Sequence, residues 1–188
     1  MTSYYTKEEL KSIGFKSIGE NVLISRKTSI YGASRVSIGN NVRIDDFTII
    51  SAGKEGIQIG NNVHIAVFCS IQGDARIILS DFCGISSKVA IYSSSDDYTG
   101  EYLTNPTVPE KYLGVITAEV FLGKHVIVGS GSVILPNIRL EDGVAIGALS
   151  LVNRNCQSFT IYSGNPIKKL CARNKNLLDL EQDYLSEQ

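Results

Sequence analysis

Acid–base chemistry at neutral pH would depend on few side chains of this sequence. Histidine has a reference pKa of about 6.5 and is suited to take a proton from an attacking hydroxyl or amine. The chain has two histidines, His64 and His125. Carboxylates can orient a histidine or bind sugar hydroxyls and ammonium groups. Four aspartates lie in two adjacent pairs: Asp45 with Asp46, and Asp96 with Asp97. These residue types indicate proton transfer on a polar substrate.

Metal and disulfide chemistry are not indicated. The four cysteines, Cys69, Cys83, Cys156 and Cys171, include no CxxC pair. Neither histidine lies at zinc-finger spacing from them. No serine or cysteine is paired with a recognisable base, so a covalent acyl-enzyme is not expected. We therefore expect no bound metal and no disulfide framework.

Length and charge exclude several classes of protein. The chain has 188 residues and a formal charge of -1, so we expect a single domain over residues 1–188 with no general attraction to nucleic acid. No apolar run reaches the roughly 18 residues of a membrane helix. Residues 1–15 lack both a basic leader and an apolar signal core. A cytoplasmic protein without membrane or nucleic-acid partners is the expectation.

A six-residue repeat would position the candidate residues. An aliphatic residue, often followed by glycine, recurs every six positions, and a regular run of it is Leu122, Val128, Ile134, Leu140, Ile146 and Val152. This period fits neither a helix nor a flat sheet, and it favours a coil of short strands with a corner every six residues. Three hexapeptides would close one triangular turn. The predicted fold class is all-β, a parallel β-helix with coils over residues 18–91 and 122–166.

Stacking of these coils predicts which side chains share a surface. The expected inward column is Ile44, Ile65, Ile85, Val128 and Ile146, and the residue before each would point outward: Arg43, His64, Gly84, Ile127 and Ala145. His64 would then lie beside a residue without a side chain, which leaves room for a ligand. A subunit contact is the alternative role for His64. We expect His125, at a repeat corner, to be structural, and Cys69 and Cys83 to fill the core.

Three segments lie outside the predicted coils. Thr6 and Glu9 have the spacing of a capping box, which predicts a short N-terminal helix. Leucines at helical spacing predict a C-terminal helix over residues 167–186. Residues 92–121 interrupt the repeats as an inserted loop, and a loop of that length in a compact domain is usually functional.

The repeats resemble those of the hexapeptide-repeat acyltransferases. The family motif, an aliphatic residue, glycine and four variable residues, reads IGENVL, IGNNVR, IGNNVH and LGKHVI here, and the resemblance covers about residues 18–166. It implies a left-handed β-helix, acetyl-CoA as co-substrate and a homotrimer with active sites between subunits. The coenzyme contacts that it implies are Ser130 in VGSGSVI, Ala148 in IGALSLV, Asn153, and the cations at and after the GNPIKK motif, Lys168, Lys169 and Arg173.

One departure from this family changes the expected base. The galactoside and maltose acetyltransferase branch keeps a catalytic histidine just after the coil, whereas residues 93–98 at the comparable loop entrance read SSSDDY. Either His64 is the base, oriented or assisted by Asp96 or Asp97, or a loop carboxylate works without a histidine. Serine and aspartate also favour turns, so a purely local role for these loop residues stays open.

Longer segments are similar to a narrower group of enzymes. YSSSDDYTGEYLTNPTVPEKY, NVRIDDFTIIS and LLDLEQDYL resemble the dTDP-4-amino-4,6-dideoxyglucose N-acyltransferases of O-antigen and capsule gene clusters. The resemblance implies acetyl transfer to an amino or hydroxyl group of a nucleotide-linked sugar, and the expected acceptor contacts are Asp45, Asp46 and Tyr98 for the sugar and Arg43 or Arg35 for a phosphate. The alternatives are a sugar O-acetyltransferase of the galactoside or maltose type, an acyltransferase acting on an amino acid or antibiotic, and a non-catalytic β-helix scaffold.

Overall fold

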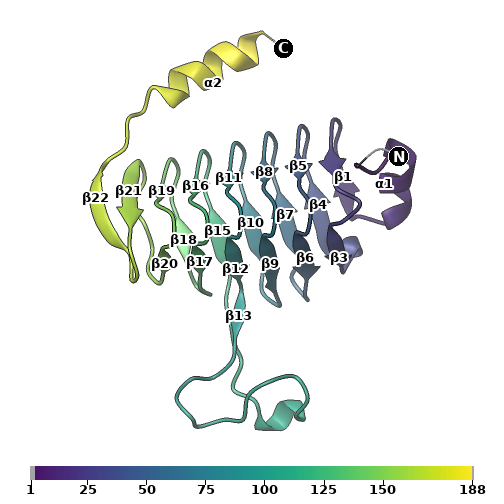
Figure 1. Ribbon diagram of the computed structural model, residues 1–188, viewed down its shortest axis with the longest axis vertical. Coiled ribbons are helices and arrows are strands. Elements are labelled where there is room, and N and C mark those ends of the chain that lie inside the picture. Colours follow the sequence, from purple (N-terminus) through teal and green to yellow (C-terminus); the bar gives the residue numbers. More distant parts are fainter. Residues whose placement is uncertain (1–2, 188) are drawn as a thin grey trace.

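The protein is a prism of short stacked strands with a protruding loop, seen in a computed structural model that describes residues 3–187 (Figure 1). Three sheets of parallel coil strands form its faces. The first face contains β1 (Ser17–Ile18), β4 (Val36–Ile38), β7 (Ile57–Ile59), β10 (Ile77–Leu79), β15 (Val120–Leu122) and β18 (Arg139–Leu140). The predicted all-β, left-handed parallel β-helix is the observed fold class.

The other two faces complete each coil. The second face contains β2 (Leu23–Ile24), β5 (Arg43–Ile44), β8 (His64–Ile65), β11 (Gly84–Ile85), β16 (Ile127–Val128), β19 (Ala145–Ile146), β21 (Thr160–Ser163) and β22 (Lys168–Ala172). The third face contains β3 (Ser29–Tyr31), β6 (Ile49–Ala52), β9 (Ser70–Gly73), β12 (Ala90–Tyr92), β17 (Val133–Ile134) and β20 (Leu151–Val152). Residues one coil apart in the sequence therefore lie on neighbouring strands of the same face.

The repeat period produces the core because one aliphatic side chain per strand points into the prism. Ile65 pairs with Ile44 on one side and Ile85 on the other, as the predicted inward column requires. All three are essentially inaccessible to solvent. Cys69 and Cys83 are also buried, and burial raises the pKa of the Cys83 thiol to about 12, which makes it an inert core group.

The corners between the first and second faces need left-handed backbone. Asn21, Asn41 and Asn62 supply it with φ near 56°, a conformation that asparagine tolerates better than most residues. Phe82 and His125 take the same corner position on later coils, also with positive φ. The C-terminal segment packs its side chains against the rings at these two corners and also bonds Asn62 at the corner before them.

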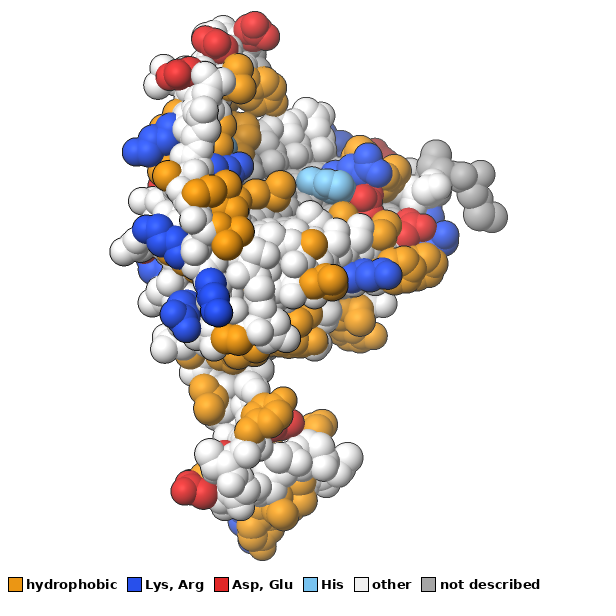
Figure 2. Space-filling view, turned by 60° about the vertical axis from the view of Figure 1, so that its left-hand side comes forward, with side chains coloured by type: hydrophobic (Ala, Val, Ile, Leu, Met, Phe, Trp, Pro, Cys, Tyr) orange, Lys and Arg blue, Asp and Glu red, His pale blue; other side chains and the backbone are white. Residues whose placement is uncertain are grey.

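The inserted loop leaves the third face on a two-stranded stem. β13 (Ser94–Ser95) pairs antiparallel with β14 (Ile116–Thr117), and a short 3-10 helix, η2 (Glu110–Tyr112), lies between them. The tip stands clear of the prism and carries exposed apolar side chains (Figure 2). They include Tyr98, Tyr102, Leu103 and Tyr112.

The N-terminal segment lies at one end of the prism, and the C-terminal segment adds a strand at the other end and then turns back along the corners of earlier coils (Figure 1). The capping box at Thr6 is formed as predicted and begins α1 (Lys7–Ile13). The C-terminal prediction was wrong in its start: residues 168–172 form β22, an antiparallel edge strand on β21, and α2 (Leu177–Ser186) begins nine residues after Lys168. The chain can extend the sheet there because β21 still offers an unpaired edge. Among the described residues, no helix is both long and apolar enough to cross a membrane.

Candidate active site

The outward column predicted on the second face is present in register. His64 pairs with Arg43 on β5 and with Gly84 on β11, and Gly84 pairs with Ile127 on β16. Successive side chains on a strand alternate between the two sides of the sheet, so a residue next to a buried isoleucine faces out. The second face therefore presents a histidine with a glycine beside it.

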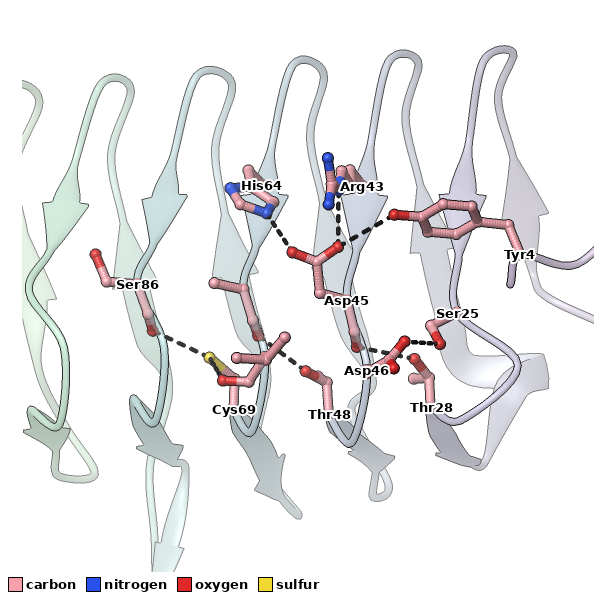
Figure 3. A network of polar contacts seen from close by, with 12 residues as sticks. Tyr4, Ser25, Thr28, Arg43, Asp45, Asp46, Thr48, His64, Cys69 and Ser86 are labelled. Atoms are coloured by element: carbon pink, nitrogen blue, oxygen red, sulfur yellow. Dashed lines mark hydrogen bonds and ion pairs between the residues drawn. The ribbon is translucent and has the colours of Figure 1, made fainter. Parts of the chain in front are cut away.

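Asp45 holds His64 in place. His64 Nε2 lies 2.8 Å from Asp45 Oδ2, and Arg43 Nε donates to Asp45 Oδ1 at 2.7 Å (Figure 3). The Tyr4 hydroxyl approaches the same carboxylate at 3.5 Å. The carboxylate is largely buried, with 12% of the side chain exposed, whereas 52% of His64 is exposed. Asp45 thus orients a histidine that remains open to a ligand.

This contact corrects two expectations. The carboxylate that orients His64 within the chain is Asp45, not Asp96 or Asp97 of the loop. Asp45 is also engaged with Arg43 and is therefore not a free group for a sugar. Asp46, the second expected sugar ligand, is in contact with Ser25 and Lys27 in the structure. Asp45 and His64 are 19 positions apart, close to one coil, so the repeat brings them to neighbouring coils without showing that their side chains pair.

The charge on Asp45 fixes which ring nitrogen of His64 can accept a proton. Burial alone would raise the pKa of the Asp45 carboxyl, but hydrogen bonds from His64 and Arg43 outweigh it and hold that pKa below its ordinary value. An ionised carboxylate can only accept, so Nε2 of His64 carries the hydrogen that faces it. Nδ1 has no protein partner among residues 3–187 and points along the face toward β11 (Figure 3). Nδ1 is the atom available to act as a base.

We expect Asp45→Asn to lower the free energy of unfolding by about 1–3 kcal/mol at neutral pH, because Arg43 and His64 lose the ion that they face. A carboxylate with a lowered folded pKa stabilises the fold above its unfolded pKa, and this contribution is lost as pH falls through the folded pKa. The gap between parent and variant should therefore narrow below about pH 4. Urea unfolding of the parent and of Asp45→Asn, at neutral and at acid pH, measures the difference in the free energy of unfolding. A difference of equal size at the two pH values would exclude the charge of Asp45 as its cause.

A hollow of about 300 Å³ adjoins His64. Its lining residues come from three consecutive coils and comprise His64, Ala66, Gly84, Ile85, Ser86, Ser87, Ile127 and Ser130. The hydroxyl of Ser86 has no hydrogen-bond partner within the described part of the chain, and Figure 3 shows Ser86 on the coil next to His64. Ser86 was not among the predicted site residues. Its position in the sequence, one coil after His64 and at the start of a corner, could have indicated that it lies beside His64.

A second hollow of about 400 Å³ lies at the base of the loop on the third face. It is lined in part by Tyr92, Asp96, Tyr98 and Val133. The Asp96 carboxylate makes no hydrogen bond to any residue between 3 and 187, so it is free to meet a ligand. Asp97 differs, because it accepts bonds from Thr99, Gly100 and Tyr102 that lower its pKa to about 2.

The two candidate bases therefore occupy different faces of one chain. His64 lines the second-face hollow, and Asp96 and Tyr98 line the third-face hollow. The bonds of Asp97 close a turn within the loop, so its geometry is that of a structural residue. The serine-and-aspartate segment thus combines one turn-forming aspartate with one unengaged aspartate.

Five of the six predicted coenzyme residues fall into three groups. Ser130 and Ala148 share the corner between the second and third faces, where Leu149 N donates to Ser130 O at 2.9 Å. Asn153 follows β20 and so lies at the next corner. Lys168 and Lys169 are exposed on β22. The first group borders the His64 hollow and leaves the corner backbone accessible.

Arg173 does not fit the predicted phosphate-binding role. Its guanidinium donates to the carbonyl oxygens of His125, Gly143 and Val144, at 2.7, 3.1 and 3.4 Å. Burial lowers its pKa from the ordinary value. Backbone carbonyls at a corner need donors, and Arg173 supplies them at two successive coils. The sequence could not distinguish such a cap from a solvated cation.

His125 has the structural role that was predicted. Its side chain is 9% exposed, its ring stacks on Phe82 with 4.9 Å between centroids, and Nε2 lies 2.7 Å from Glu181 Oε2 on α2. Tyr184 on the same helix donates to Asn62 Oδ1. The histidine therefore anchors the C-terminal helix. No group of three or more potential metal ligands occurs among residues 3–187.

Comparison with known proteins gives relatives that match most of the chain. A dTDP-4-amino-4,6-dideoxy-D-glucose acyltransferase of Escherichia coli is 51% identical over 182 residues, which cover 97% of this chain and 95% of the relative. A putative lipopolysaccharide biosynthesis O-acetyl transferase, WbbJ of Escherichia coli strain K12, is 24% identical and matches 85% of this chain and 72% of its own length. No family model matches the chain.

Solved structures agree with these relatives. AntD, an N-acyltransferase from Bacillus cereus, is 44% identical and superposes over the whole of both chains with a TM-score of 0.96. Its structures include complexes with dTDP and coenzyme A, and with dTDP-4-amino-4,6-dideoxyglucose and coenzyme A. A galactoside acetyltransferase in complex with coenzyme A has the same fold, with 18% identity, a TM-score of 0.63, and coverage of 90% of this chain and 70% of its own.

Proposed function

This chain belongs to the dTDP-4-amino-4,6-dideoxy-D-glucose acyltransferase family, and we propose from that premise that it transfers an acetyl group from acetyl-CoA to the amino group of a dTDP-linked 4-amino-4,6-dideoxyhexose. The observation that carries the proposal is 51% identity across nearly the whole of both chains. The site supports it, because an oriented histidine and a free serine hydroxyl border a hollow next to the predicted coenzyme corner.

The reaction needs three events at the thioester. The amine nitrogen attacks the carbonyl carbon, the carbon–sulfur bond breaks, and the sulfur leaves with coenzyme A as its thiol. The amine gives up a proton to Nδ1 of His64 or to the Asp96 carboxylate, and the protonated base then passes this proton to the departing sulfur. The Ser86 hydroxyl would donate to the carbonyl oxygen while negative charge develops there. The acyl group passes directly to the amine, without a covalent acyl-enzyme.

We propose the contacts to the acceptor sugar nucleotide from side chains that are exposed or border a hollow. Arg43 is half exposed although it is paired with Asp45, and it is proposed to meet the nucleotide diphosphate. Asp46 is proposed to reach the sugar, in competition with its contact to Lys27. Tyr98 is almost fully exposed and lines the loop hollow with Asp96, which suits a stacking contact with the sugar.

We also propose a homotrimer. The first coils of the third face and the adjoining corner expose the apolar side chains of Tyr31, Phe47, Ile49 and Phe68. Apolar side chains that adjoin one another on a flat face favour burial against another subunit. A threefold arrangement that sets the third face of one subunit against the second face of the next would bring the Asp96 hollow toward the His64 hollow. Light scattering at micromolar concentration should give three times the chain mass, and a monomeric mass would reject the assembly.

Transfer to a sugar hydroxyl is the second candidate function, because WbbJ bears the name of an O-acetyl transferase. Release of coenzyme A thiol should be measured with dTDP-4-amino-4,6-dideoxyglucose and with a matched sugar that carries a hydroxyl in place of the amine. We expect thiol release with the amine and a product that survives mild alkali, because an amide resists hydrolysis and an ester does not. Thiol release with the hydroxyl sugar alone would favour O-acetylation. We further propose that the protein acts in O-antigen or capsule synthesis and that it is located in the cytoplasm.

A further inference from the structure

Gly84 is a glycine that the fold does not require. At most corner glycines an added Cβ would collide with the next coil: at Gly39 it would lie 2.7 Å from the Gly60 carbonyl oxygen, and at Gly129 2.5 Å from the Ala148 backbone nitrogen. At Gly84 the nearest atom to an added Cβ is Ile127 Cγ1, at 3.7 Å, which is an ordinary contact. Its φ is also not positive. Neither backbone conformation nor crowding explains the missing side chain.

A glycine within a strand often marks a place where a ligand comes close to the backbone. The space over Gly84 belongs to the hollow beside His64, between the histidine ring on one coil and Ile127 on the next. Ile127 is 43% exposed, so an apolar surface borders that space without a protein partner in the described chain. The space over Gly84 is therefore open, apolar on one side and adjacent to a base.

The polar and apolar parts of the hollow have a definite order along β11. Ser86 directly follows β11, two residues after Gly84, and residues two apart in extended backbone lie on the same side, about 7 Å from one another. A thioester carbonyl at the Ser86 hydroxyl would point its substituent along the face toward Gly84 and Ile127. A two-carbon acetyl group would leave the Gly84 end empty, whereas a four-carbon chain would reach it.

We propose that the space over Gly84 is an acyl-chain subsite and that Gly84 sets the length of the acyl group transferred, admitting chains longer than acetyl. The inference rests on the proposed acyltransferase function and adds the class of acyl donor, a short-chain aliphatic acyl-CoA. AntD, which is 44% identical, has been solved in complex with 3-hydroxybutyryl-CoA, so a relative binds a coenzyme A ester with a four-carbon acyl group. Ile127 supplies the apolar wall of the subsite.

The test compares acyl donors in the parent enzyme and in Gly84→Ala. The rate constant kcat/KM is measured with acetyl-CoA and with butyryl-CoA, using dTDP-4-amino-4,6-dideoxyglucose as acceptor. The parent should use the two donors within about tenfold of each other. Gly84→Ala should lower the butyryl-to-acetyl ratio by about 10- to 200-fold, since one methyl group of space in an apolar pocket has that effect. Gly84→Val should lower it further.

Control variants separate a subsite from a general defect. Ala145→Val adds bulk to the same outward column two coils from Gly84, and its ratio should equal that of the parent. Thermal unfolding shows whether each variant folds, and Gly84→Ala is expected to fold because its new Cβ makes only an ordinary contact. A parent that uses acetyl-CoA but not butyryl-CoA, or a Gly84→Ala ratio equal to the parent's, would overturn the inference. Failure of the parent with every acyl-CoA would instead reject the proposed function.

Discussion

His64→Asn is expected to lower kcat for acyl transfer by about 10²- to 10⁴-fold, with little change in coenzyme binding, because removal of a general base has an effect of that size. Nε2 is held by Asp45 at 2.8 Å, which leaves Nδ1 directed along the face toward the hollow. Asparagine retains a hydrogen-bond donor for Asp45 but has no group that titrates near neutral pH. Turnover at saturating acetyl-CoA and amine acceptor gives the measurement.

The size of the loss of kcat in His64→Asn also indicates whether the acceptor group is an amine or a hydroxyl. A neutral amine is already nucleophilic, so loss of the base should slow an amine less than a hydroxyl, whose proton is held far more tightly. With the amine sugar the defect of His64→Asn should therefore fall at the lower end of the expected range. A defect near its upper end would favour a hydroxyl acceptor.

Asp96→Asn is the competing variant, and Asp97→Asn is its matched control in the same loop. Asp96 has no bonded partner for its carboxylate among residues 3–187, whereas Asp97 holds a turn through Thr99 and Gly100. If His64 is the base, Asp96→Asn should be milder and should act mainly on KM for the sugar. Asp97→Asn should act through the order of the loop. If His64→Asn keeps a kcat close to that of the parent and Asp96→Asn loses turnover, the base is the Asp96 carboxylate and not His64.

The positions of the second-face residues could be predicted because the repeat determines them. One inward aliphatic residue per strand sets the register, so the pairing of His64 with Gly84 follows from counting residues. The same count could not give the partner of His64. Asp45 lies at a corner just after Ile44, and its side chain reaches His64 only through the rotamer chosen there, which depends on Arg43 as well.

The end of the solenoid was the least predictable part. Residues 168–172 form an exposed edge strand whose sequence, KKLCA, has no alternation that would mark it as one. It forms because β21 offers an unpaired edge, which is a property of the assembled prism and not of the segment. The role of Arg173 was unpredictable for the same reason. The carbonyls of Gly143 and Val144 that it bonds are about 30 residues away in the sequence and meet it only in the assembled prism.

Ala148→Trp is expected to weaken acetyl-CoA binding by about 5- to 150-fold, the equivalent of about 1–3 kcal/mol of overpacking. Ala148 is exposed at the corner that Ser130 shares, and Ser130 lines the His64 hollow. An indole there would occupy the path that we propose for the pantetheine arm of the coenzyme. Ser34→Trp is the matched control and should bind acetyl-CoA as the parent does, because Ser34 is also a small exposed residue but lies in η1 (Ala33–Arg35) near the other end of the prism.

Lys168→Glu tests the other end of the proposed coenzyme path. Lys168 is exposed on β22, and reversal of its charge should weaken acetyl-CoA binding by about tenfold through repulsion of the phosphates, more at low salt than at high salt. Arg173→Ala should instead lower stability, since it removes donors from three corner carbonyls, and should leave the salt dependence of binding unchanged. Calorimetric titration with acetyl-CoA at two salt concentrations separates these outcomes. Parent-like affinity in both Ala148→Trp and Lys168→Glu would mean that the coenzyme lies along another corner of the prism.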